Sequence, residues 1–297
     1  MSGAPRGNCW EELYPDGVCH VTDFIRSGLD QQIVSLPSGV VSNGETRYPV
    51  DEPSMRAFLE TFFTRHLFQV QRSLIEYVVS PDFQNILRSG PVRLLDIGSG
   101  PAVASLATID LVHRVMHGVS WRPAVYPRAV RMVHVLNDTS SICLATGKRL
   151  LEACHRLGKH NAGASPNDRV FTLSTAFPNN IPQIQYLGSF LGGYDVVILS
   201  YVVHPLIDDC GLRELVTAVR ILERLCRPDG RILIVQDRFH ESVVRRLAHM
   251  LGVTYEEQAV TQEIYPARGS NETYTYTYYD CLYAPRKNSV ARQTLGA

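Results

Sequence analysis

The sequence predicts an α/β protein: a doubly wound sheet of seven strands with a C-terminal antiparallel hairpin and an N-terminal helical cap. Three observations support this fold. From residue 92 onward, short apolar runs alternate with helical patterns, which is typical of parallel sheets covered by helices on both faces. The first run leads into a glycine-rich turn. Near the C-terminus two segments of alternating polarity follow one another, which indicates an antiparallel hairpin.

The N-terminal arm and cap are expected over residues 1–89. Residues 1–50 are rich in Gly, Pro and Ser, with turn signals such as YPDG and LPSG, and predict a poorly ordered arm or a loop-rich cover. From the N-cap candidate Asp51, apolar residues recur at helical spacing as far as Val78 and predict a single helix. Ser80-Pro81 ends that helix, and a shorter helix is expected over 81–88.

The sheet is expected within a domain spanning residues 90–285. Its parallel strands are predicted at 92–97, 130–136, 169–174, 194–200 and 230–236. Helices are predicted near 102–117, 139–157, 181–191, 211–226 and 240–251. HGVSWRPAVYPRA is interpreted as a loop insertion before the second strand. The hairpin strands are YEEQAVTQEIYP and ETYTYTYYDCLYAP, joined by ARGSN, and residues 286–297 are expected to form a disordered tail.

Composition narrows the classes of function. Lys+Arg and Asp+Glu both total 29 among 297 residues, so no global field attracts nucleic acid or an anionic membrane. The longest apolar run, YDVVILSYVV, is far shorter than the roughly 20 residues that span a bilayer. The first residues lack a secretory signal, and seven dispersed cysteines predict reduced thiols. We expect a cytoplasmic protein with no membrane association, for which nucleic acid is a disfavoured partner.

The glycine turn lies in VRLLDIGSGPAVASL, residues 92–106. Gly98 and Gly100 supply the first two glycines of a dinucleotide-binding pattern, whose third small residue allows close packing on a pyrophosphate. That third position is Val103, so the turn is better suited to a nucleoside without a pyrophosphate. Asp96, at the end of the strand, would face a positively charged group of such a ligand.

LLDIGSGPAVASL resembles the first motif of the class I S-adenosylmethionine (SAM) methyltransferases, and the resemblance extends over about residues 90–285. It implies a Rossmann-like sheet that ends in an antiparallel hairpin, with SAM as the cofactor. It places Asp96, Gly98, Ser99 and Gly100 at the methionine part of SAM. The third glycine often found in this motif is replaced by Ala102.

The resemblance assigns further cofactor contacts to the ends of the following strands. Asp138, with Asn137 as the rival, would accept hydrogen bonds from the ribose hydroxyls, although Asp138 also fits an ordinary helix N-cap. Thr175, Ala176 and Phe177 would form the adenine wall, and Phe177 fits the core equally well.

The end of the fourth strand would face the transferred methyl group. Ser200 is assigned to the cofactor, and Tyr201 and His204 are the catalytic candidates. His204 is suited to act as a general base, or alternatively to cap a helix or bond to backbone. Asp237 and Arg238 follow the fifth strand, where they could reach a substrate. His113 and His117 have metal-ligand spacing, but no Cys or acidic residue completes a site, so no metal is expected.

The predicted function is SAM-dependent methyl transfer to an O or N atom of a small-molecule acceptor. The first alternative is an RNA or ribosome-associated methyltransferase, and the second is a catalytically silent methyltransferase fold that acts as a binding protein. Aromatic and basic residues of the cap fit either packing on the sheet or stacking on a planar molecule or RNA base: Arg47, Tyr48, Phe62, Phe63, Arg65, His66, Phe68 and Arg72.

Overall fold

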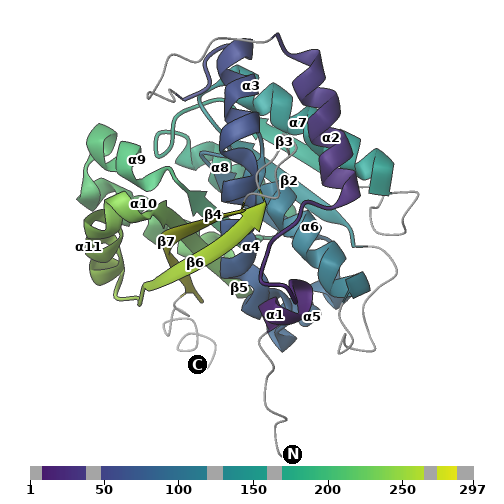
Figure 1. Cartoon of the computed structure of the whole chain (residues 1–297). Coiled ribbons are helices and arrows are strands. Elements are labelled where there is room, and N and C mark those ends of the chain that lie inside the picture. The colour runs from purple at the N-terminus through teal and green to yellow at the C-terminus, as the bar shows by residue number, and fades with distance from the viewer. Residues whose placement is uncertain (1–8, 38–47, 119–129, 159–168, 264–272, 286–297) are drawn as a thin grey trace, which may run out of the picture.

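The computed structural model describes residues 9–37, 48–118, 130–158, 169–263 and 273–285. In this part of the chain the strands form one seven-stranded sheet in the order β3-β2-β1-β4-β5-β7-β6 (Figure 1). The order confirms the predicted fold class. The segment ARGSN, most of the predicted insertion and the C-terminal tail lie outside the described residues.

The five parallel strands position the functional residues. β1 (Val92–Ile97) lies between β2 (Met132–Asn137) and β4 (Tyr194–Ser200). β3 (Arg169–Leu173) pairs with β2, and β5 (Cys226–Asp237) pairs with β4. The direction of winding reverses between β1 and β4, and open α/β sheets bind ligands beyond the carboxyl ends of their strands at such a point.

The C-terminal hairpin completes the sheet. β6 (Glu256–Glu263) pairs antiparallel along its whole length with residues 273–280 of β7 (Thr273–Tyr283). β7 inserts between β6 and β5 and runs antiparallel to both. The alternating polarity of the two segments therefore predicted both the strands and their pairing correctly.

Helices cover both faces of the sheet. They are needed on both because successive side chains of each strand point to opposite faces. Leu94, Ile198 and Val235 face one apolar core together with α6 (Val103–Gly118) and α7 (Ser141–Gly158). The neighbouring residues Leu95, Val197 and Ile234 face a second core on the opposite side. That second core is closed by α8 (Ile181–Leu191), α10 (Leu212–Leu225) and α11 (Glu241–Leu251).

The first fifty residues contain more helix than the sequence predicted. α1 (Cys9–Leu13) and α2 (Asp23–Ser35) both contribute buried side chains to the first core. α2 packs against α7, and its Gly28 faces the side chains of Ala153 and Cys154, where an added Cβ would come within 3.5 Å of the Cys154 sulfur. The YPDG signal before α2 does form a turn, with the Gly17 N–H bonded to the Tyr14 carbonyl at 2.9 Å, but tertiary contacts stabilise a helix after it.

The predicted helix from Asp51 to Val78 is two helices. Asp51 caps α3 (Glu52–Thr61) through a capping box with Ser54, as the N-cap prediction required. The chain breaks at Phe62, and α4 (Phe63–Val78) then crosses the sheet beside α6. α4 is almost wholly buried, so it forms part of the layer on this face of the sheet, and only its start reaches the ligand edge. α5 (Pro81–Ser89) follows as predicted.

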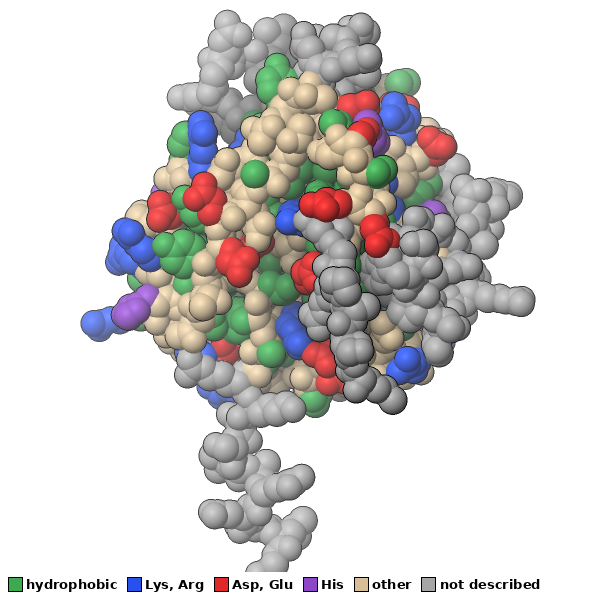
Figure 2. Space-filling model, turned by 60° about the horizontal axis from the view of Figure 1, so that its bottom comes forward, with side chains coloured by type: hydrophobic (Ala, Val, Ile, Leu, Met, Phe, Trp, Pro, Cys, Tyr) green, Lys and Arg blue, Asp and Glu red, His purple; other side chains and the backbone are tan. Residues whose placement is uncertain are grey.

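A further helix beyond the prediction lies after β4. α9 (Val203–Cys210) precedes α10, and Gly211, with a φ of 82°, separates the two. No helix among the described residues is long and apolar enough to cross a membrane. On the face drawn in Figure 2, acidic and basic side chains are interspersed, in agreement with the equal numbers of the two charges.

Candidate active site

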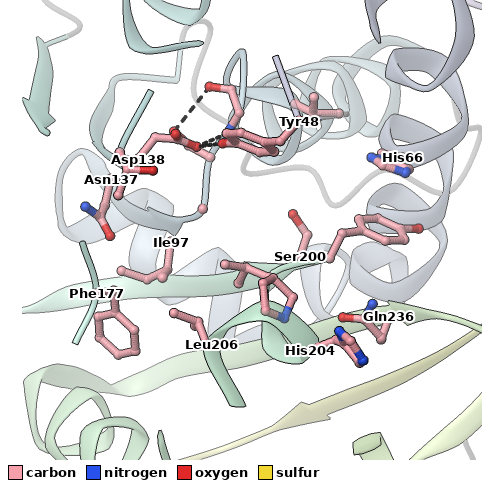
Figure 3. Close-up of a pocket in the computed structure, with 18 of the residues that line it drawn as sticks. Tyr48, His66, Ile97, Asn137, Asp138, Phe177, Ser200, His204, Leu206 and Gln236 are labelled. Atoms are coloured by element: carbon pink, nitrogen blue, oxygen red, sulfur yellow. Dashed lines mark hydrogen bonds between the residues drawn. The ribbon is translucent and has the colours of Figure 1, made fainter. Parts of the chain in front are cut away.

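A cavity of about 490 Å³ opens at the carboxyl ends of the central strands. Figure 3 shows it as two regions on either side of Ser200: Ile97, Asn137, Asp138 and Phe177 lie on one side, and His66, His204 and Gln236 lie on the other. Residues from widely separated parts of the chain line this single cavity. Its size is within the range of roughly 300–1,000 Å³ that is typical of small-molecule sites.

The glycine turn after β1 forms the floor of the first region. Gly98 and Gly100 have φ values of 64° and 52°, and Ala102 has a φ of 61°. A Cβ on Gly98 would lie 2.6 Å from a methyl group of Val202, so only glycine fits there. A Cβ on Gly100 would meet nothing within 4 Å, so the space above this residue is open to a ligand. Ala102 has the backbone conformation that glycine usually adopts.

Asp138 lies beside this turn, directly after β2. Its Oδ2 accepts a hydrogen bond from the Gly100 N–H at 2.8 Å, and its Oδ1 accepts one from the Ser140 N–H at 2.8 Å. The hydroxyl of Tyr48 also donates to Oδ2. Burial raises the pKa of the Asp138 carboxyl, and these hydrogen bonds partly offset that shift. The carboxylate therefore lines the cavity and holds Ser140, whose own hydroxyl accepts the N–H of Cys143 at 3.3 Å and caps α7.

Asn137 holds the next strand in place. Its side-chain N–H groups donate to the carbonyls of Leu173 and Thr175 at 3.0 and 2.8 Å. Asn137, Thr175, Ala176 and Phe177 all line the cavity, although Phe177 is also buried in the second core. The amide donors of Asn137 are thus occupied by the end of β3, and both Asn137 and Asp138 line the cavity.

Asp96 differs from its expected orientation. Along β1, Ile97 lines the cavity, while Asp96 points to the other face and accepts hydrogen bonds from the N–H and hydroxyl of Ser105 at 3.1 and 3.0 Å. Burial raises its pKa to about 7. Its Oδ1 is buried with no hydrogen-bond partner among the described residues. The expectation that Asp96 faces a charged ligand group is not met, because side chains alternate along a strand.

The end of β4 carries the first catalytic candidate. Tyr201 has a φ of 61°, and its ring stacks on His66 with the centroids 3.6 Å apart. Its hydroxyl donates to the side-chain oxygen of Gln69 on α4. Burial raises the pKa of Tyr201 well above the ordinary value for a phenol. Tyr201 is thus suited to form a wall of the cavity rather than to accept a proton.

The second candidate, His204, meets a histidine that sequence reasoning missed. The rings of His204 and His240 lie 4.1 Å apart between centroids. Nδ1 of His240 is 2.8 Å from Oδ1 of Asp237, and all three residues line the cavity. The available signal was the position of His240, three residues after Asp237 at the carboxyl end of β5.

The aromatic and basic residues of the cap divide between the cavity and the core. Phe63 and Phe68 are fully buried in the first core, and Arg72 lies over the ring of Trp10. Arg47 is outside the described residues. The other residues of the group, together with Phe58, line the cavity: Tyr48, Phe62, Arg65 and His66. Among the described residues no three His, Cys, Asp or Glu side chains gather as a metal site.

Comparison with family models and with curated proteins finds no match. Several solved structures are similar in fold. A SAM-dependent methyltransferase from Agrobacterium tumefaciens is 12% identical, with a TM-score of 0.43 over 73% of this chain and 62% of that chain. A precorrin-6Y C5,15-methyltransferase from Geobacter metallireducens is 11% identical, with a TM-score of 0.42 over 84% and 94% of the two chains. An rRNA methylase from Streptococcus thermophilus is 9% identical, with a TM-score of 0.34 over 69% and 95%.

This chain thus spans under two thirds of the Agrobacterium protein. The fold is assigned from the strand order of the chain itself. Five parallel strands have the order 3-2-1-4-5, and the antiparallel strand β7 is inserted between β5 and β6. This is the class I methyltransferase fold.

Proposed function

We propose that the protein is a SAM-dependent methyltransferase that acts on an O or N atom of a small-molecule acceptor. One observation carries this proposal. A single cavity joins an open glycine turn and a buried carboxylate at one end to a pair of histidines at the other. The first end suits a nucleoside, and the second supplies groups that can take up a proton from an acceptor.

The residues at the nucleoside end fit SAM. The open space above Gly100 allows a ligand to lie against the backbone. Asp138 would receive the ribose hydroxyls, and Thr175, Ala176 and Phe177 would lie along the adenine. Ser99 and Ser200 line the cavity, and the methionine part would lie beside them. Asp96 would act from behind the turn, by holding the start of α6 through Ser105.

When bound, SAM supplies a methyl group on a positively charged sulfur, and the electron pair of the broken C–S bond stays on sulfur. The protein has three tasks in such a reaction. It orients the acceptor in line with the C–S bond, keeps water out of the cavity, and removes a proton where the acceptor carries one. Two features would orient the acceptor and exclude water. They are the close contact between Gly98 and Val202 and the wall formed by Tyr201 and His66.

The test is binding of SAM and S-adenosylhomocysteine by calorimetry, first to the wild type and then to Gly100→Val. A side chain at position 100 would enter the open space, so binding should be lost. Gly17→Val is the matched control, because Gly17 also has a positive φ of 74° and no atom near an added Cβ, but does not line the cavity. Equal affinity of wild type and folded Gly100→Val would contradict the proposal.

Two other outcomes would favour the alternatives. Binding of SAM without turnover on any acceptor would favour a catalytically silent binding protein, and co-purifying RNA would favour an RNA methyltransferase. We also propose a cytoplasmic location, where seven dispersed cysteines would remain reduced.

A further inference from the structure

The region of the cavity beyond Ser200 has two chemically distinct sides, and we call it the acceptor chamber. Its aromatic wall consists of Phe58, Phe62, His66 and Tyr201. Its polar corner consists of His204, Asp237 and His240. All of these residues line the cavity. They come from α3, the break before α4, α4 itself, the end of β4, α9, the end of β5 and the short helix that follows β5.

The aromatic wall is continuous. The ring centroids of Phe58 and Phe62 are 5.8 Å apart, and both lie 5.8–5.9 Å from that of His66. His66 in turn stacks on Tyr201 with an interplanar angle of 13°. Such distances are typical of interacting aromatic rings. Planar ligands are well matched to a wall of this kind, because they can stack on it without loss of rotamer freedom.

The wall carries no net charge at neutral pH. Desolvation and the nearby Arg65 cation lower the pKa of His66 to about 3, so its ring stays neutral. Burial raises the pKa of Tyr201, so its hydroxyl stays protonated. The wall therefore favours the flat, apolar face of a ligand.

The polar corner holds one imidazole in a defined tautomer. Asp237 Oδ1 lies 2.8 Å from Nδ1 of His240 and also accepts the N–H of Phe239 at 2.9 Å. A carboxylate in this position makes Nδ1 the protonated nitrogen and leaves the lone pair on Nε2. Nδ1 of His204 is 3.4 Å from Asp208, whose side chain is 66% exposed, so His204 is held less firmly.

We propose that the acceptor is a small planar aromatic molecule with an O–H or N–H group, and that His240 is the general base that removes this proton. This inference rests on the proposed function. The ring of the acceptor stacks on the aromatic wall, and its O–H or N–H points to the polar corner. The proton moves to Nε2 of His240, and the electron pair left on the oxygen or nitrogen forms the new bond to the methyl carbon. Asp237 stabilises the resulting imidazolium.

Charges around the corner favour a small acceptor over RNA. Asp208 and Asp209 on α9 are exposed, and Asp209 lines the cavity. These two carboxylates oppose the approach of a polyanion, whereas a small neutral molecule carries no charge for them to repel. Asp237 and His204 contact His240, Arg238 and Glu241 lie within two residues of it in the chain, and Arg65 lines the same cavity.

The first experiment measures which acceptors bind to the full chain in the presence of S-adenosylhomocysteine. The probes are 4-methylphenol, indole and imidazole as planar molecules, cyclohexanol and butylamine as non-planar ones, and total RNA. Saturation-transfer NMR should detect the planar probes alone. Phe62→Ala should abolish this signal, whereas Phe190→Ala, an exposed Phe on α8, should retain it.

Two results would overturn this acceptor class. In the first, S-adenosylhomocysteine binds but none of the planar probes does. In the second, RNA or a non-planar probe is methylated. Failure of S-adenosylhomocysteine itself to bind would instead contradict the proposed function, so the two failures are distinguishable.

The second experiment tests the base. Nitrogen-15 NMR of the imidazoles should show His240 protonated at Nδ1, and Asp237→Asn should change this pattern. With an accepted planar probe, His240→Gln should lower the transfer rate by about 100-fold or more and leave probe binding intact. His249→Gln, an exposed histidine on α11, is the control. A larger loss in His204→Gln than in His240→Gln would overturn the assignment.

Discussion

The hydroxyl of Tyr48 donates a hydrogen bond to Oδ2 of Asp138, the same carboxylate oxygen that accepts the N–H of Gly100. Tyr48 precedes α3, ninety residues before Asp138 in the chain. The backbone next to it is anchored as well, because the carbonyl of Pro49 accepts the Ser140 hydroxyl at 2.8 Å. The segment before α3 thus reaches the carboxylate that we assign to the ribose.

The first prediction concerns competition at this carboxylate. If ribose hydroxyls bind to Asp138, the Tyr48 hydroxyl must give up its hydrogen bond, at a cost of about 1 kcal/mol. Tyr48→Phe should therefore bind SAM about fivefold more tightly than wild type, as measured by calorimetry. Tyr274→Phe is the control, because Tyr274 is an exposed residue of β7. Weaker binding in Tyr48→Phe would show that Tyr48 supports the cofactor instead of competing with it.

The second prediction separates Asp138 from Asn137. Asp138→Ala should weaken SAM binding by about 1–3 kcal/mol, the scale of hydrogen bonds to a charged group. Asn137→Ala should cost less in affinity and more in stability, because its amide bonds the end of β3. Calorimetry and thermal unfolding of both variants measure the two effects. A greater loss of affinity in Asn137→Ala would reverse the assignment.

The third prediction concerns the N-terminal helices. Asp110 on α6 is fully buried and accepts hydrogen bonds from Gln71 and Arg114 at 2.7 and 2.8 Å and from the hydroxyl of Thr22. It thereby joins α6 to α4 and to the residue that precedes α2. Asp110→Ala leaves Arg114 without its carboxylate partner and should lower the free energy of unfolding by about 3–5 kcal/mol in urea. Folded Asp110→Ala should still bind SAM as wild type does, and a loss of affinity would show coupling to the cavity.

The fourth prediction concerns pH. Burial raises the pKa of Asp280 on β7 to about 6, although a hydrogen bond from Ser73 opposes the shift. The folded protein therefore holds this proton more tightly than the unfolded chain. The stabilisation is complete below about pH 4 and is lost as pH rises through about 6. Asp96, with its pKa raised to about 7, contributes in the same direction.

Asp280→Asn isolates one of these groups. Between pH 4 and pH 7.5 the free energy of unfolding of wild type should fall by up to about 3 kcal/mol relative to that of Asp280→Asn. Chemical denaturation at several pH values measures the difference between the two proteins, in which the opposite contribution of His66 cancels. Parallel pH profiles would mean that Asp280 is ionised in the folded protein.

Local sequence signals predicted much of the fold. β1, β4 and α8 have the predicted bounds, because their apolar period and flanking residues lie within the element itself. Asp51 forms its capping box with a residue only three positions away. The glycine turn and the place of Asp138 after a strand were predicted for the same reason. A positive φ favours glycine at that position, and the end of the apolar run marks the end of the strand.

Only the tertiary structure decided how distant segments meet. α2 is helical because it packs on α7, and α3 separates from α4 at Phe62 although the apolar period continues through the break. Tyr48 bonds to Asp138, and His240 lies against His204. The residues of each pair are too far apart in the sequence for a local pattern to predict the contact. The sequence by itself therefore determined the strand alternation, the caps and the glycine turn. Packing of the assembled sheet determined the acceptor chamber, because its walls come from segments that become neighbours only after the chain has folded.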